Sequence, residues 1–316
     1  MSKSTILITG ANGVLGNAFK RNEALFLDHK LVYTSGRECD LTSPKECQNI
    51  FDKFEPDFVF HLAAKSGGIG LSKNYQATLF RDNLLMSINI ADNCVRKKVK
   101  KCIFTLSVGM YPEDSKLPIK ENSNLTGKPH NSGTGYAYAK AIIEPLIETY
   151  SSQHKVNFIG VVPNGIYGPE DNFDPEHSAM LPSLIRKACL SKSNNEKFEV
   201  WGDGSPLRQY TFVDDYVYIY KWCLNNFNRP EIINIGTAEE LSIDKIAKLI
   251  CKSYQISPEK INYLTDKPKG IHRRPMDNSK FIKESDFRFT PLEEGIKKTC
   301  LWFEKNKDLI TIGNKS

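Results

Sequence analysis

An apolar run followed by three closely spaced glycines constrains the N-terminal part of this chain more than any other feature. The sequence STILITGANGVLG predicts a strand over 4–10 and a helix from about residue 14, with glycines at positions 10, 13 and 16 between and within them. Glycine permits a tight turn and close approach of the backbone to a pyrophosphate, and the N-terminus of a helix favours negative charge. This strand–turn–helix context predicts a dinucleotide-binding loop.

Short apolar runs alternate with helical stretches through the rest of the first half. The expected strands are 4–10, 29–35, 56–64, 100–107, 156–163 and a later 231–236, and the expected helices lie near 14–25, 43–54, 78–98 and 136–153. Apolar strands separated by helices predict a parallel sheet that is covered on both faces. The expected fold class is therefore α/β, a Rossmann-type doubly wound parallel sheet with a smaller C-terminal α/β substrate domain.

The pattern loosens after about residue 168, where Pro and Gly become frequent and short helices are expected at 180–191, 243–254 and 292–305. We expect a dinucleotide-binding domain formed by 1–168 plus about 208–240. The smaller domain is expected to comprise about 169–207 plus 241–316 and to form one wall of a cleft.

Composition and charge exclude several classes of protein. The net charge of +6 is spread along the chain, so nucleic acid is not an expected partner. No apolar run reaches the ~18 residues needed to span a bilayer, so no membrane is expected either. The eight cysteines lack CxxC or CxH spacing, and we expect no metal site. Since the N-terminus lacks a secretory signal pattern, we expect reduced thiols and a cytoplasmic protein.

The residues after the second predicted strand bear on the choice between the two nicotinamide dinucleotides. An NAD-binding chain usually has an acidic residue there, bonded to the ribose 2′-OH. Here the chain reads TSGRE over 34–38, and Arg37 suits a 2′-phosphate, which favours NADP(H). The adjacent Glu38 leaves NAD open, and Arg37 could instead be a solvated loop cation. Asp40 could reach the adenine.

A serine, a tyrosine and a lysine form the candidate catalytic set. Tyr136 and Lys140 are four residues apart on a predicted helix and so share a face, while Ser107 ends the fourth predicted strand. Ligands of open parallel sheets bind at such strand ends. An ammonium group stabilises a nearby phenolate, so we expect Lys140 to lower the Tyr136 pKa and Tyr136 to protonate a substrate oxygen. Ser107 would donate a second hydrogen bond to that oxygen.

Further motifs extend over almost the whole chain. They are HLAA (61–64), YP (111–112), PHN (129–131), GYAYAK (135–140), YGPEDNF (167–173), LPSLIRK (181–187), VWGDGSPLRQY (200–210) and DFRFTP (286–291). With them the chain resembles the extended short-chain dehydrogenase/reductase family, and within it the GDP-L-fucose synthases. The resemblance implies NADPH as cofactor and a GDP-linked 4-keto sugar as substrate. It also implies a homodimer, which could pair through the predicted helices 78–98 and 136–153.

The resemblance places the functional residues on specific positions. It implies that the catalytic residues are Ser107, Tyr136 and Lys140. The expected cofactor contacts are Gly10, Gly13, Val14, Leu15, Gly16, Arg37, Asp40, Leu41, Leu62, Ala63, Ala64, Lys140 and Pro163. The expected substrate contacts are Ser107, Asn164, Lys187, Trp201, Arg208 and Arg274. The cations among them can pair with a diphosphate, and the tryptophan can pack on a sugar or base.

Two departures from the family pattern alter the expected activity. Fucose synthases carry a Cys two residues after the strand-end serine, as a base at C3 and C5 of the sugar, and a His as its partner acid. Here those positions are Gly109 and Ala179. His177 lies nearby in sequence and is an open substitute, although proton transfer needs contact near ~2.6–3.2 Å. The sequence therefore predicts a C4 reductase without 3,5-epimerase activity.

A third departure concerns the sugar. The family's PTN reads PNG here, with Asn164 followed by Gly165. We expect Gly109 and Gly165 to widen the pocket and to admit a heptose. Relatives that reduce GDP-4-keto-heptoses in bacterial capsular polysaccharide pathways resemble this pattern.

Three other functions remain as alternatives. The first is a bifunctional 3,5-epimerase/4-reductase, that is, a GDP-L-fucose synthase that uses His177 and another base. The second is a nucleotide-sugar 4,6-dehydratase, a class with an Asp–Glu pair where this chain has Val108 and Gly109. The third is a non-catalytic NADP-binding protein, a class that commonly loses the Tyr or the Lys, both of which are present here.

Overall fold

A six-stranded parallel sheet forms the centre of the molecule. The computed structural model describes residues 3–67, 74–267 and 269–313. The strands lie in the order β10-β5-β4-β3-β1-β2, and every neighbouring pair is parallel. Their bounds are β1 (Ser4–Thr9), β2 (His29–Thr34), β3 (Phe58–His61), β4 (Lys101–Thr105), β5 (Phe158–Pro163) and β10 (Ile232–Ile235). The predicted parallel doubly wound sheet is confirmed.

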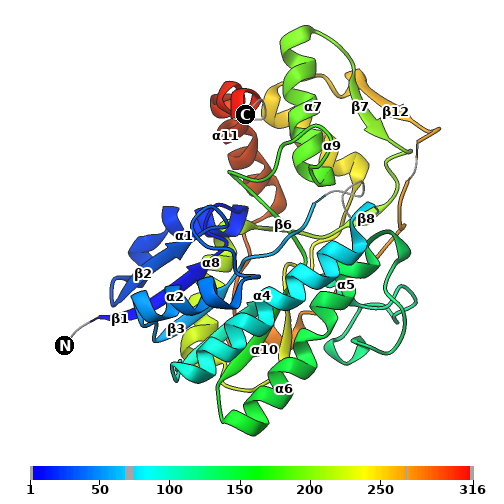
Figure 1. Cartoon of the computed structure of the whole chain (residues 1–316). Coiled ribbons are helices and arrows are strands. Elements are labelled where there is room, and N and C mark those ends of the chain that lie inside the picture. Colours follow the sequence, from blue (N-terminus) through cyan, green and yellow to red (C-terminus); the bar gives the residue numbers. More distant parts are fainter. Residues whose placement is uncertain (1–2, 68–73, 268, 314–316) are drawn as a thin grey trace.

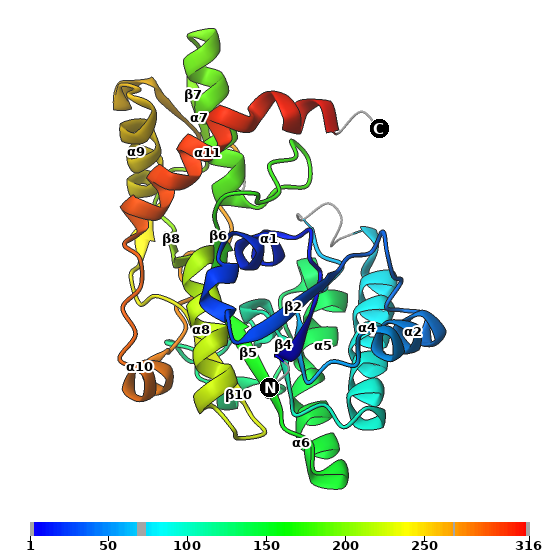
Figure 2. The same ribbon diagram turned by 90° about the vertical axis from the view of Figure 1, so that its left-hand side faces the viewer.

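Helices cover both faces of this sheet, as Figure 2 shows with the sheet between two helical layers. One face packs against α2 (Pro44–Phe54), α4 (Gln76–Arg96) and α6 (Ile143–His154). The other packs against α1 (Val14–Arg21), α8 (Val213–Asn226) and α10 (Ser279–Ser285). Burial of sheet side chains on both sides explains why these strands are continuously apolar.

The helix expected over 136–153 is two helices, α5 (Thr134–Ala141) and α6, which meet at Ile142. Pro145 explains the break, because it has no N–H to donate to the carbonyl of Ala141. That carbonyl instead accepts a 2.9 Å hydrogen bond from the side chain of Asn124. The interruption leaves α5 as a short helix that carries Tyr136 and Lys140.

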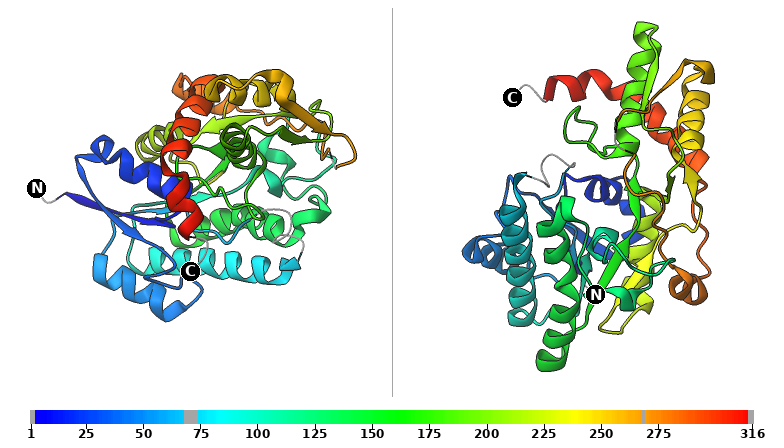
Figure 3. Two further views of the ribbon diagram at one scale, coloured as in Figure 1. Left: turned by 90° about the horizontal axis from the view of Figure 1, so that it is seen from above. Right: turned by 90° about the vertical axis from the view of Figure 1, so that its right-hand side faces the viewer.

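A smaller region lies above the large sheet in the view of Figure 1, and Figure 3 shows it from two further sides. It contains α7 (Met180–Asn194), α9 (Ile243–Tyr254) and α11 (Leu292–Gly313), which share a hydrophobic core with the parallel pair β7 (Phe198–Trp201) and β12 (Ile261–Leu264). Two further strand pairs occur, β6 (Gly165–Tyr167) with β9 (Tyr210–Phe212) and β8 (Leu207–Arg208) with β11 (Leu241–Ser242).

Two features were not anticipated from the sequence. Helix α8 was missed as an element, although it lies within the range assigned to the larger domain. Helix α10 packs on the large sheet through Phe281, although its residues were assigned to the smaller domain. Among the described helices, none combines the length and the apolar character needed to cross a membrane.

Candidate active site

The glycine loop follows β1. In the sheet, β1 has β2 on one side and β3 on the other, so the strand order changes direction at this point. Gly10 has φ +71°, and a Cβ there would lie 2.7 Å from the Ala63 backbone nitrogen. A Cβ at Gly16 would lie 2.6 Å from the Cα of Ala11, so a side chain cannot fit at either position. Helix α1 follows with Gly13 as N-cap and no side chain bonded to its first turn. Free backbone N–H groups at this switch point suit a pyrophosphate.

This loop forms one end of a cavity of about 990 Å³. Most of the predicted cofactor contacts line it, namely Gly10, Gly13, Val14, Leu15, Gly16, Arg37, Leu62, Ala63, Ala64, Lys140 and Pro163. Asp40 and Leu41 are absent from the lining. The Asp40 carboxylate instead accepts two hydrogen bonds from Thr42, and the Leu41 side chain is buried in the core.

The end of β2 presents a cation rather than an acid to this cavity. Arg37 lines it, whereas Glu38 turns back and accepts hydrogen bonds from the N–H and hydroxyl of Ser35 at 2.8 and 3.0 Å. A carboxylate engaged in this way is not placed for a ribose 2′-OH. The arrangement suits the 2′-phosphate of NADP(H) better than NAD.

Ser107, Tyr136 and Lys140 line the same cavity. Ser107 follows β4, and its Oγ accepts a 3.2 Å hydrogen bond from the N–H of Gly109. The Lys140 Nζ lies 5.8 Å from the centre of the Tyr136 ring and donates a 2.7 Å hydrogen bond to the carbonyl of Thr105. Ser107, which follows β4, and two residues of α5 about thirty positions later in the sequence therefore line one cavity.

The expected effect of Lys140 on the Tyr136 pKa is not met. Burial raises the pKa of Tyr136 to about 12, and the hydrogen bond with Ser107 only partly offsets it. Lys140 is itself buried, and burial lowers its pKa to about 8. Desolvation is the main cause of both pKa shifts. The result keeps Tyr136 in the neutral form, which is the form that can give away a proton.

A second cavity of about 280 Å³ adjoins the first. The residues that line both are Val108, Asn164, Gly165 and Tyr210. Arg208 lies in the second cavity, where its guanidinium donates hydrogen bonds to the carbonyls of Leu207 and Ile271 at 2.7 and 2.8 Å. Burial lowers the pKa of this guanidinium.

Arg274 lines the same cavity. It donates to the carbonyls of Tyr111 and Pro112 at 2.5 and 3.2 Å, and its Nε is buried without a hydrogen-bond partner among the described residues. Neither Arg208 nor Arg274 pairs with a carboxylate in the part of the chain that the structure describes, and burial lowers the Arg274 pKa as well. Glu240, the carboxylate in this lining, is paired with Arg273 at 2.6 Å. Two partly buried guanidiniums that make no ion pair among the described residues suit a diphosphate, which accepts hydrogen bonds from such groups.

Two other predicted substrate contacts lie together but outside both cavity linings. The Lys187 Nζ of α7 is 5.1 Å from the centre of the Trp201 ring at the end of β7. The Trp201 side chain is 53% exposed, which leaves its ring open to a ligand. This pair can therefore contact only a part of a ligand that lies outside the two cavities.

The structure places Asn164 differently from the expected sugar contact. Its side-chain amide donates to the carbonyl of Thr237 at 3.1 Å, and its side-chain oxygen accepts from the hydroxyl of Thr211 at 2.6 Å. The side chain is 5% exposed and packs on Gly236. Asn164 therefore supports the wall of the site through a buried network, and its amide is already engaged within the protein.

The expectation that Gly165 widens the pocket is wrong. A Cβ at Gly165 would lie 2.6 Å from Cδ1 of Tyr210 and 2.8 Å from the Gln209 carbonyl, so the space is already filled. At Gly109, in contrast, a Cβ would meet only the Ser107 Oγ, at 3.4 Å. Additional room is therefore left beside Gly109, which lines neither cavity but directly follows Val108, a lining residue of both.

The two positions that carry the family's Cys and His remain without proton-transferring side chains. Ala179 lines the first cavity and caps α7, while His177 is exposed and absent from the lining. The backbone N–H of His177 is held by the Asp174 carboxylate at 2.8 Å. This turn holds His177 outside the cavity that Ala179 lines.

Sequence reasoning missed several lining residues. Asn12, Ser35, Ser66 and Thr105 line the first cavity, and each lies beside a motif that was recognised. Asp171 and Tyr210 line it too. Both belong to quoted motifs, and their side-chain types alone could have marked them as polar candidates.

A doubly wound sheet with a glycine loop at its switch point and a Ser–Tyr–Lys set at the end of β4 defines a short-chain dehydrogenase/reductase. Residues 6–236 match the model of the NAD dependent epimerase/dehydratase family, and the chain belongs to that family. It is thus an enzyme of the short-chain dehydrogenase/reductase type.

Two kinds of known protein are similar along nearly the full length. The chain is 34% identical over 310 residues to a GDP-L-fucose synthase of Dictyostelium discoideum, covering 96% of this chain and 97% of that protein. The crystal structure of a GDP-L-fucose synthetase from Naegleria fowleri bound to NADP has a TM-score of 0.93 at 31% identity, covering 98% and 95% of the two chains. A GDP-mannoheptose C4 reductase from Campylobacter jejuni with NADP bound has a TM-score of 0.86 at 27% identity, covering 96% and 99%.

Proposed function

We propose that this protein is an NADPH-dependent C4-keto reductase of a GDP-linked 4-keto (6-deoxy) sugar, with a heptose as the expected sugar and no 3,5-epimerase activity. One observation carries the proposal. Ser107, Tyr136 and Lys140 share a cavity with Ala179 and adjoin Gly109, so hydride-transfer residues are present where proton-abstracting ones are missing. The similarity to GDP-L-fucose synthases and to a GDP-mannoheptose C4 reductase supports the GDP-sugar class.

The cavity residues supply the proton chemistry of such a reduction. NADPH, when bound, supplies the hydride that becomes the hydrogen on C4. Tyr136 donates its hydroxyl proton to the former ketone oxygen, so one hydride and one proton convert the ketone to a secondary alcohol. Ser107 donates a hydrogen bond to the same oxygen, since its Oγ accepts from Gly109 and its own proton can be directed at the substrate. Lys140 offsets the charge left on Tyr136 and would hold the nicotinamide ribose.

The second cavity supplies the binding of the nucleotide. Arg208 and Arg274 would pair with the diphosphate, and Lys187 and Trp201 would contact the guanosine part. The sugar would then extend from the second cavity to Tyr136, past the residues that line both cavities. In this pose the C4 ketone would lie between the diphosphate-binding arginines and the proton donor.

The experiment is an incubation in D2O with NADPH and GDP-4-keto-6-deoxymannose, repeated with the ketoheptose analogue. NADPH absorbance and product mass are followed. NADPH loss without deuterium on carbon supports a dedicated C4 reductase, and the substrate that reacts faster indicates the sugar. Deuterium at C3 or C5 would instead establish the bifunctional GDP-L-fucose synthase alternative, which the identity to fucose synthases favours.

A gain-of-function variant tests the lost epimerase step. Gly109→Cys combined with Ala179→His restores the family pair, and the 3.4 Å spacing at residue 109 allows the added side chain. We expect deuterium exchange at C3 or C5 in the double variant and none in either single variant. Absence of exchange in a folded double variant that still reduces the ketone would contradict this account of the loss.

The proposed enzyme works in the cytoplasm as a homodimer. All eight cysteines are free and buried, which is compatible with a reducing compartment. Phe80 and Leu85 of α4 are 36% and 37% exposed and would contribute to a dimer surface. Phe80→Glu should shift the molar mass measured by light scattering from dimer to monomer, and an unchanged mass would place the interface elsewhere.

A further inference from the structure

Tyr210 and Gly165 are direct partners in the parallel pair of β6 and β9. The Tyr210 ring lies where a side chain at 165 would begin, with its Cδ1 and Cε1 at 2.6 and 2.8 Å from the position of a Cβ. Real Cβ atoms do not make such short contacts, so the two positions exclude each other: a full ring at 210 goes with glycine at 165. Because both residues line both cavities, this ring stands at the junction between them.

The ring is held against a second aromatic side chain. The Tyr210 and Tyr167 rings meet edge-to-face, with ring centres 6.0 Å apart, and Tyr167 is itself buried. A side chain fixed in this way behaves as a rigid wall, which is what discrimination by shape requires.

The loop after β4 offers more room at the edge of the reaction cavity, since Gly109 is not itself a lining residue but directly follows Val108, which lines both cavities. Gly109 is exposed, and a Cβ there would meet only the Ser107 Oγ at 3.4 Å. Ala179, which also lines the cavity, projects no more than a methyl group. Room for a larger sugar substituent is therefore available near Ser107 and absent near Gly165.

We propose that Tyr210 is a specificity-determining residue, whose ring closes the Gly165 side and directs the longer exocyclic carbon chain of a GDP-linked 4-keto-heptose to the Gly109 side. This inference rests on the proposed function and adds to it which wall selects the sugar. A hydrophobic wall that gains or loses a few carbon atoms changes the relative kcat/KM of two sugars by about 10–200-fold.

The test compares kcat/KM for GDP-4-keto-6-deoxymannose and its ketoheptose analogue in the full-length protein with NADPH. Gly109→Leu should lower the heptose-to-hexose ratio about tenfold or more by filling the open side, and Tyr210→Leu should bring the ratio towards one by removing the wall. Tyr210→Phe keeps the ring and should leave the ratio unchanged. Tyr254→Leu is the control, since Tyr254 is buried in the core of the smaller region and is absent from both cavity linings, and it should lower the melting temperature without changing the ratio.

Dissociation constants of the corresponding 4-hydroxy GDP-sugars, measured by calorimetry on the same variants, distinguish a failure of the proposed reductase activity from a failure of the inference about Tyr210. If the wild type oxidises no NADPH with either ketone but the dissociation constants of the two sugars shift in opposite senses in Gly109→Leu, the proposed reductase is wrong and the sugar-selecting wall stands. If both ratios are the same in Gly109→Leu and Tyr210→Leu as in the wild type, the inference about Tyr210 is overturned.

Discussion

The ammonium group of Lys140 donates a 2.7 Å hydrogen bond to the carbonyl oxygen of Thr105. Thr105 is the last residue of β4, two positions before Ser107, so this bond ties α5 to the strand end that presents the serine. The geometry of all three candidate catalytic residues therefore depends on a lysine that is only 3% exposed. Burial lowers the Lys140 pKa to about 8, which brings loss of its charge within reach of ordinary alkaline buffers.

Lys140 should make activity and stability respond to pH in opposite directions. Loss of the ammonium charge removes the group that offsets a Tyr136 phenolate, so kcat/KM for reduction should fall as the pH rises through about 8. The unfolded chain binds the proton more tightly than the folded one between that value and 10.5, so the contribution of this group to the unfolding free energy rises over the same window. The two quantities are measured by NADPH oxidation and by urea unfolding.

A neutral replacement checks this assignment. Lys140→Met should lower kcat/KM about 10²–10⁴-fold and should abolish the alkaline limb of the profile. Lys100→Met, which removes an exposed lysine paired with Asp57 at 2.7 Å, is the control and should retain both. An alkaline limb that persists in Lys140→Met would assign it to another group.

Tyr136→Phe should remove proton donation while retaining the ring. We expect kcat to fall about 10²–10⁴-fold, with little change in the dissociation constant of NADPH measured by fluorescence. Tyr138→Phe is a matched control, because Tyr138 lies two residues further along α5 and is absent from both cavity linings. Equal losses in the two variants would mean that Tyr136 acts through packing.

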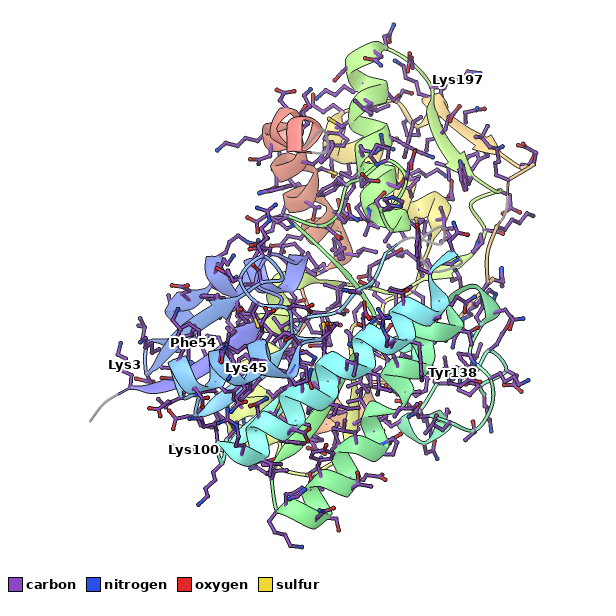
Figure 4. All side chains as sticks on the ribbon, in the orientation of Figure 1. Lys3, Lys45, Phe54, Lys100, Tyr138 and Lys197 are labelled. Atoms are coloured by element: carbon purple, nitrogen blue, oxygen red, sulfur yellow. The ribbon has the colours of Figure 1, made fainter. Side chains whose placement is uncertain are left out.

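Arg37 should determine the preference for NADPH over NADH. Arg37→Ala should lower the ratio of kcat/KM with NADPH to that with NADH by about 10–100-fold, the worth of a charged hydrogen bond to a 2′-phosphate. Lys45→Ala removes an exposed cation of α2, which Figure 4 labels, and should leave the ratio unchanged. A variant that loses activity equally with both cofactors would place Arg37 at a group that they share.

The sheet and the glycine loop could be predicted because their signals are local. Each expected strand occurs. Glycine is required at positions 10 and 16 because a Cβ at either position would clash with neighbouring backbone atoms. Helix α8 was missed because its Val, Tyr and Ile residues are typical of strands. Five of its buried side chains, at 213, 216, 217, 220 and 224, recur with a helical period, and this periodicity is the signal that could have identified the helix.

The walls of the site were less predictable because they arise from long-range packing. The contact of Tyr210 with Gly165 depends on the pairing of β6 with β9, which no local pattern encodes. In the same way, the Asn164 side chain is engaged by Thr211 and Thr237, residues far away in the sequence. Residue types therefore indicated the chemistry of the site, while the three-dimensional fold decided where space remains.

Asp171 should make the protein less stable as the pH rises from acidic to neutral values. This carboxyl group lines the reaction cavity, and no cation pairs with it among the described residues; its Oδ1 accepts a 2.7 Å hydrogen bond from the N–H of Asn172. Burial raises its pKa from 3.8 to about 7, so the folded protein binds more protons than the unfolded chain between these values. Stability contributed by this group is present below pH 3.8 and is lost progressively as the pH approaches 7.

The substitution Asp171→Asn tests this sign directly, because an amide keeps the side-chain oxygen that accepts from Asn172 but never acquires the charge. The melting temperature of the variant should exceed that of the wild type at pH 8, where the partly buried carboxylate is ionised, and should approach it at acidic pH. Asp114→Asn, at an exposed position, should give no such pH-dependent difference. A gain of equal size at both pH values would show that packing, rather than removal of a buried charge, stabilises the variant, and no gain at pH 8 would mean that Asp171 is solvated when ionised.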